Sequence, residues 1–253
     1  MTKFFSRLFS GKFVNHSAVA DNVALLLMYR FAYPFSVFLS RLHLTPNQIT
    51  TLSLIFSIAA FLSIIVDDGI LMFSTFWGIS LLLDFCDGTV ARMTNSGRKN
   101  AFRYDHISDL FKISLIILGA SLRYDDRLVW ISSFSASFCF MFFSVLNQEL
   151  VTSIKFLERQ SPLIPHSEES STAHPRLRNR YRLIAWAVKN NAMLTAYKNV
   201  RTGFLTINGH TLLLFFLLPL NREWSIGALS YLSIVSVIGI RSRIAMLLSL
   251  RKW

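Results

Sequence analysis

Four aspartates in one short stretch are the residues of this sequence with the clearest potential for chemistry. The stretch begins Asp84-Phe-Cys-Asp87-Gly88-Thr-Val-Ala91-Arg92 and ends Asp105-His-Ile-Ser-Asp109. Apolar sequence flanks it on both sides, and an aspartate at the centre of a membrane helix costs about 2.5 to 3.5 kcal/mol. Four such residues would cost on the order of 10 kcal/mol without compensation. The sequence therefore predicts a cavity, a bound cation or both around them.

The spacing of the aspartates places each pair on one face of a helix. Asp84 and Asp87 are three residues apart, and Asp105 and Asp109 are four apart, as neighbours on a helix surface are. A short connection makes the two helices antiparallel neighbours. Facing carboxylates are how helix bundles build dinuclear metal sites, and oxygen ligands favour Mg²⁺ or Mn²⁺ over zinc. We therefore predict two divalent cations held by four carboxylates. This arrangement is suited to binding a diphosphate.

Small and basic residues adjoin these carboxylates. Gly88 and Ala91 remove bulk and would let a ligand approach the helix, while Arg92 places a positive charge where phosphate oxygens would lie. Taken singly, each has an ordinary alternative. Gly88 and Ala91 could serve helix packing, and Arg92 could be an interfacial arginine whose head group reaches the membrane surface.

Composition indicates an integral membrane protein. Of the 253 residues, 53% are hydrophobic and only 16% are charged, and the formal net charge is +12. Such a charge could suggest nucleic-acid binding, but no basic module interleaved with aromatic residues is present. A basic surface facing lipid head groups explains the charge better. We therefore predict a membrane protein that does not bind nucleic acid.

Apolar runs predict an all-α fold with six transmembrane helices. They are expected at about 47–66, 70–94, 101–122, 128–150, 203–220 and 224–240. Thr45 followed by Pro46 is expected to cap the first span. Residues 1–44 are expected to form an N-terminal arm and an interfacial amphipathic helix interrupted at Pro34.

Residues 45–253 are expected to form the six-span domain. Within it, residues 151–202 are predicted to be a hydrophilic insertion with a helix at about 178–198, and a basic amphipathic tail is predicted from Arg241 to Trp253.

The distribution of basic residues sets the expected orientation. With six spans both termini share one side, and all but three of the 26 Lys and Arg fall on or near it. Because basic loops stay in the cytoplasm, the termini and the Asp cluster are expected to face the cytoplasm, in a bacterial inner membrane. The pairs Asp67-Asp68 and Asp125-Asp126 are expected to be solvated turns on the opposite side.

The pattern D-x-x-D-G-x-x-A-R, followed after eight residues by G-x-x-x-D-x-x-x-D, is the signature of the CDP-alcohol phosphotransferase family, which this sequence resembles. The matching residues are Asp84, Asp87, Gly88, Ala91, Arg92, Asp105 and Asp109. Ala101 stands where the family has its second glycine. The opening Thr45-Pro46-Asn47-x-Ile49-Thr50 also looks like the start of the family's first span, and the resemblance extends over about 35–240.

The resemblance implies a metal-dependent transfer of a substituted phosphate group from a CDP-alcohol to an acceptor hydroxyl, with release of CMP, in phospholipid or envelope-lipid biosynthesis. The four aspartates would hold two divalent cations, and Arg92 would bind the pyrophosphate. Gly88 and Ala91 would leave room for the cytidine, with Asn47 nearby. Asp109 would act as the general base. At least one substrate would be a lipid, and the enzyme would be a homodimer.

The substrates stay open at this point. A CDP-diacylglycerol donor is favoured by family frequency, and the alternative is transfer of a small phospho-head group from its CDP conjugate to a lipid alcohol. Arg98, Lys99, Arg103 and Lys112 are candidate contacts for a phosphate-bearing acceptor, or ordinary basic residues of the cytoplasmic side. His106 is interpreted as a hydrogen-bond partner of a metal ligand in preference to a base.

Two other classes of protein also use membrane carboxylates. A cation transporter would explain the aspartates but leaves Gly88, Ala91 and Arg92 without a role. A membrane prenyltransferase grips a diphosphate with Asp and Mg²⁺, but its Asp-rich motifs normally lie on two separated helix ends without the continuation from Gly88 to Arg92.

Overall fold

The computed structural model describes residues 23–66, 69–94, 101–160 and 213–250, and this part of the chain is all-helical, as predicted. The elements are α3 (Val23–Arg41), α4 (Pro46–Ile65), α5 (Ile70–Met93), α6 (Ala101–Tyr124), α7 (Arg127–Gln160), the short 3₁₀ helix η1 (Leu214–Leu217) and α11 (Arg222–Leu250). The predictions for the N-terminal arm, for Asp67-Asp68 and for a helix at 178–198 fall outside the described residues.

Helix α4 is capped at both of its ends. Thr45 and Gln48 form a capping box at its start, in which the Thr45 N–H donates to Gln48 Oε1 at 2.8 Å, and Pro46 occupies the first turn as predicted. At the other end, Arg123 Nη1 of α6 donates to the carbonyls of Ile64 and Val66 at 2.9 and 2.8 Å. These carbonyls have no partner within the helix, so Arg123 joins the end of α4 to α6.

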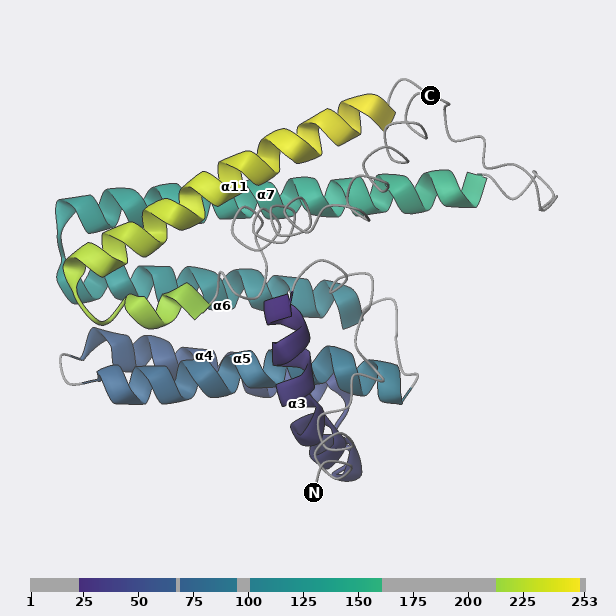
Figure 1. Ribbon diagram of the computed structural model, residues 1–253, viewed down its shortest axis with the longest axis horizontal. Helices are drawn as coiled ribbons and strands as arrows, with labels where there is room; N and C mark the ends of the chain where they lie inside the picture. The colour runs from purple at the N-terminus through teal and green to yellow at the C-terminus, as the bar shows by residue number, and fades with distance from the viewer. Residues whose placement is uncertain (1–22, 67–68, 95–100, 161–212, 251–253) are drawn as a thin grey trace, which may run out of the picture.

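The helices form a bundle in which the site-bearing helices lie together (Figure 1). Helix α4 packs against both α5 and α6, α3 lies across α5, and α7 pairs with α11. The end of α4, the start of α5 and the α6–α7 and η1–α11 connections lie at one end of the bundle, whereas the end of α5 and the start of α6 lie at the other. The C-terminal half of α5 and the N-terminal half of α6, which carry the four aspartates, therefore lie at this second end.

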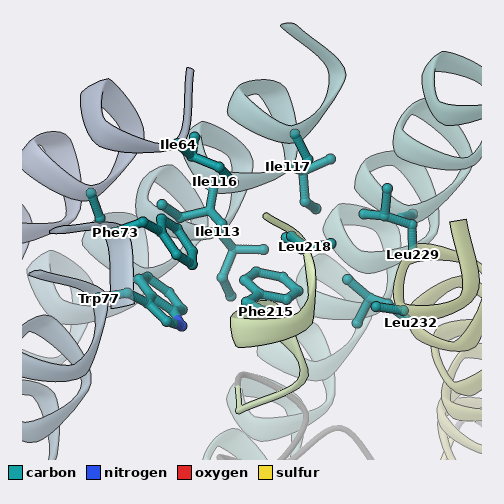
Figure 2. Packing of buried hydrophobic residues seen from close by; sticks show 14 of the residues in the cluster. Ile64, Phe73, Trp77, Ile113, Ile116, Ile117, Phe215, Leu218, Leu229 and Leu232 are labelled. Carbon is teal, nitrogen blue, oxygen red and sulfur yellow. The ribbon is translucent and has the colours of Figure 1, made fainter. Parts of the chain in front are cut away.

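The main core, part of which Figure 2 shows, lies toward the end of the bundle at which α6 is joined to α7. Buried side chains from α4, α5, α6, η1 and α11 meet there, and the Trp77 and Phe215 rings stack with centroids 5.7 Å apart. The Leu218 carbonyl accepts from Tyr124 Oη at 2.9 Å and from Ser225 Oγ at 3.0 Å. These contacts tie the segment around η1 to α5, α6 and α11.

Four helices in the described part of the chain are long and apolar enough to cross a membrane. They are α4, α5, Arg127–Ser153 of α7 and Arg222–Leu248 of α11. Large apolar side chains such as Leu71 and Phe134 are exposed on their outer surfaces, which suits contact with lipid. The apolar helices indicate an integral membrane protein.

The remaining predicted spans are not settled by these helices. The predicted third span is the helix α6, which carries more charge than those four. Most of the predicted fifth span, 203–220, falls outside the described residues. The count of six spans and the interfacial position of α3 therefore stay predictions.

The predicted interruption at Pro34 is wrong, because α3 continues through it. Proline removes one N–H bond from a helix. Packing on α5 supports the helix on either side of that gap, since Ala32 and Leu39 are both buried against α5 in a second apolar cluster.

Two helices continue beyond the ends of the predicted spans. Helix α7 continues to Gln160, ten residues into the segment expected to be an insertion, because no proline occurs before Pro162. Helix α11 continues to Leu250 through the predicted tail. Arg243 holds this extension against α7, since its Nε donates to Asn147 Oδ1 at 2.9 Å.

The pair Asp125-Asp126 forms the turn between α6 and α7, as predicted. Asp126 Oδ1 accepts from the backbone N–H groups of Leu128 and Val129 at 2.9 and 3.3 Å and so caps α7. The Arg222 guanidinium lies 3.1 Å from the same oxygen and holds the pKa of Asp126 below its ordinary value.

We predict that Gly119→Ala destabilises the protein, whereas Gly227→Ala does not. A Cβ on Gly119 of α6 would overlap Ile64 Cγ2 and lie 3.2 Å from Phe61 Cδ2, both on α4, while a Cβ on Gly227 would meet nothing within 4 Å. Overpacking a filled core costs about 1 to 3 kcal/mol. Thermal unfolding in detergent should show a lower Tm for Gly119→Ala only. Equal Tm values would contradict the close α4–α6 contact.

Candidate active site

Carboxylates from α5 and α6 converge toward the end of the bundle where α5 ends and α6 begins. Asp84, Asp105 and Asp109 each offer an oxygen atom, and these atoms all lie within 4.8 Å of one another. Like charges this close repel strongly when they are partly removed from water. A donor set made only of carboxylate oxygens fits a hard divalent cation such as Mg²⁺ or Mn²⁺.

The fourth carboxylate, Asp87, lies beside this group on the side of α4. It is buried, and its Oδ2 accepts a 2.7 Å hydrogen bond from Thr50 Oγ1. The carboxylate of Asp105 is its close neighbour across the two helices. The structure thus brings three of the four predicted ligands into one group and holds the fourth next to it through a threonine.

A buried lysine lies within the carboxylate group. Lys112 of α6 is only 4% exposed. Its Nζ donates to Asp84 Oδ1 and forms an ion pair with Asp109 Oδ1 at 2.7 Å. A third contact, at 3.3 Å, reaches Ser53 Oγ of α4. The sequence suggested Lys112 as a phosphate contact, but its spacing of three from Asp109 was the signal for this ion pair.

Arg92 is positioned by an aromatic residue from a third helix. Its guanidinium lies over the Tyr29 ring of α3, 5.4 Å from the ring centroid, and its Nη2 donates to Thr89 Oγ1 at 3.3 Å. A Cβ on Gly88 would lie 3.4 Å from Arg92 Nη1, so the guanidinium lies close to this glycine. The sequence pattern assigned no role to Tyr29, because α3 was expected only to lie on the membrane.

The other predicted nucleotide contacts, Ala91 and Asn47, lie on α5 and α4. Ala91 is half-buried next to Arg92 on α5, and Asn47 is exposed in the first turn of α4. Thr50 lies one turn after Asn47 and contacts Asp87. Thr50 belongs to the family-like opening of this helix, which was the available signal for its position.

His106 faces α7 and not the carboxylate group. Its Nε2 lies 3.1 Å from Ser144 Oγ. It is therefore a hydrogen-bond partner, as interpreted from the sequence, but the partner that the structure describes is a serine and not a metal ligand. Of the other candidate phosphate contacts, Arg98 and Lys99 fall outside the described residues, as does the side chain of Arg103.

The comparison with protein families assigns this site to a known group. The sequence model of the CDP-alcohol phosphatidyltransferases matches residues 43–169, half of the chain. The matched region contains α4, α5, α6 and α7, and with them all four carboxylates of the site. The comparison with curated proteins returned no match. The chain belongs to the CDP-alcohol phosphatidyltransferase family.

Proposed function

We propose that this protein transfers a substituted phosphate group from a CDP-alcohol to an acceptor hydroxyl, releasing CMP, in phospholipid or envelope-lipid synthesis. The observation that carries the proposal is the convergence of Asp84 with Asp105 and Asp109 within 4.8 Å, in the region that the family matches. We further propose that the termini and the site face the cytoplasm, and that the enzyme is a homodimer with six spans.

In the proposed reaction Asp109 is the general base. Its side chain is 37% exposed, compared with 22% for Asp84, so it is the more accessible to an acceptor. The acceptor oxygen forms a bond to the phosphorus that bears the alcohol group, and its proton passes to Asp109. The bond from this phosphorus to the CMP oxygen breaks, and the electron pair leaves with CMP.

The basic groups complete the binding of the donor. Arg92 offers a planar fork of N–H donors to the pyrophosphate, and Tyr29 beneath it limits the orientations of the guanidinium. Gly88 and Ala91 leave space for the cytidine, with Asn47 near. A divalent cation held by Asp84, Asp87, Asp105 and Asp109 would neutralise charge on the diphosphate.

An apolar pocket supports a lipid substrate. Its volume is about 320 Å³. It is lined by Leu27, Met28 and Phe31 of α3, by Gly78, Leu81, Leu82 and Phe85 of α5, and by Leu213 and Phe216 at η1. The Phe85 ring packs against the Tyr29 ring with centroids 5.1 Å apart, and Arg92 lies over the same Tyr29 ring, so an acyl chain in this pocket would begin near Arg92. We favour CDP-diacylglycerol as the donor, and a lipid alcohol as acceptor is the alternative that the same pocket allows.

We predict that Asp109→Asn lowers CMP release by about 10²- to 10⁴-fold, because an amide cannot accept the proton of the acceptor. CMP should be measured by mass spectrometry with a panel of CDP-alcohols and acceptors, with Mg²⁺ or Mn²⁺ and with EDTA. Asp125→Asn, at the opposite end of the bundle, is the matched control and should retain activity. CMP release that persists in EDTA would exclude the metal-dependent reaction.

We predict that CDP raises the Tm of the protein in a Mg²⁺-dependent way and that Arg92→Lys weakens CDP binding by about tenfold or more. A hydrogen bond to a charged group contributes about 1.5 to 3 kcal/mol, and lysine cannot reproduce the planar fork over Tyr29. Tm measured against CDP concentration gives the affinity. Arg222→Lys, which pairs with Asp126 at the opposite end of the bundle, should bind CDP normally. An unchanged affinity of Arg92→Lys would remove Arg92 from the donor site.

We predict that Gly78→Leu impairs use of a long-chain lipid substrate. Gly78 lines the pocket, and a Cβ there would lie 3.7 Å from Phe216 Cζ, so the larger side chain would fill acyl space. Exclusion of two methylene groups, at about 0.8 kcal/mol each, lowers kcat/KM by about tenfold. A short-chain analogue should be used normally, and Gly227→Leu is the control variant. Equal losses for both chain lengths would argue against the pocket as an acyl site.

A further inference from the structure

We propose that Lys112 takes the place of one of the two divalent cations implied by the family signature, so that this site binds a single divalent cation beside a fixed ammonium group. The inference rests on the proposed function and concerns the number of cations in the same site. Lys112 lies outside the signature residues, so this feature belongs to the chain and not to the motif.

The position of the ammonium group is that of a cation joining the two helices. Lys112 Nζ lies between Oδ1 of Asp84 on α5 and Oδ1 of Asp109 on α6, and it contacts both. The 2.7 Å separation from Asp109 is that of a charge-assisted hydrogen bond. A divalent ion that joined the same two oxygens would need the space that this group fills.

The ammonium group is also fully satisfied where it lies. A lysine has three N–H donors, and the acceptors on Asp84, Asp109 and Ser53 match that number. The residue is only 4% exposed. Ser53 Oγ is itself held, since it donates to the Ser80 carbonyl at 2.9 Å. Moving Lys112 aside would leave a buried cation without its partners, which opposes its displacement by a metal ion.

The spacing of the carboxylates suits one ion. Two oxygens bound to one Mg²⁺ at about 2.0 to 2.1 Å lie at most about 4.2 Å apart. Asp84, Asp105 and Asp109 each offer an oxygen atom within 4.8 Å of the others, which is close to the span of a single coordination sphere. Asp87 is next to this group but accepts a hydrogen bond from Thr50.

This arrangement gives Lys112 a second consequence for the proposed reaction. The ammonium group engages Oδ1 of Asp109 and so fixes the orientation of the carboxylate that we propose as the base. Lys112 is therefore a positioning residue for the base as well as a substitute for a cation.

The test is the number of ions bound by each chain. Full-length protein in detergent, stripped with EDTA, is dialysed against Mn²⁺, and bound manganese is counted by elemental analysis and examined by electron paramagnetic resonance. We expect about one Mn²⁺ per wild-type chain with the spectrum of an isolated ion. In Lys112→Met the count should rise to about two, with a spin-coupled spectrum, because the space between Asp84 and Asp109 is freed. Arg243→Met removes a half-buried cation elsewhere and should leave the count at one.

Two ions in the wild-type chain would overturn the inference, and so would a folded Lys112→Met protein that still binds only one. If Lys112→Met does not fold, the wild-type count decides alone. CMP release measured on the same samples separates the two proposals. Two ions with CMP release contradict only the role of Lys112, whereas one ion without CMP release from any donor contradicts the proposed function.

Discussion

Repulsion between carboxylates is the constraint on which the rest of this structure depends. Two like charges about 4 Å apart repel by about 4 kcal/mol at the effective dielectric of a protein surface, and more when they are buried. Asp84, Asp105 and Asp109 are held closer than they would settle alone. The bundle can keep them there only if it supplies positive charge, and Lys112 does so from within α6.

Helix α4 makes this juxtaposition possible, although it contributes no carboxylate. It packs against both α5 and α6 and supplies Thr50 to Asp87 and Ser53 to Lys112. At the far end of α4, Arg123 of α6 binds the last carbonyls of α4. Gly119 of α6 permits close contact between these two helices. The polar contacts at one end and the close packing at the other set the distance between the two site-bearing helices.

Helix α3 joins the candidate site to the apolar pocket. Tyr29 lies beneath Arg92, while Leu27 and Phe31 of the same helix line the apolar pocket. A charged nucleotide and an acyl chain must both be present when a lipid is the donor or the acceptor. Because α3 borders both the Arg92 guanidinium and the apolar pocket, it can hold the nucleotide and the acyl chain next to each other.

The sequence alone determined the helical membrane class, the cap at Thr45, the starts of α4 and α5 and the group of aspartates, because these follow from local patterns of polarity and spacing. Helices α7 and α11 continue past the predicted span ends at about 150 and 240, since polar and charged residues can extend a helix where no proline interrupts it. Only the tertiary structure decided which charges meet. The spacing of three residues indicated the Lys112–Asp109 pair, but the contacts of Lys112 with Asp84, of Thr50 with Asp87 and of Tyr29 with Arg92 join different helices. Such contacts depend on packing between helices, which no spacing along one segment specifies.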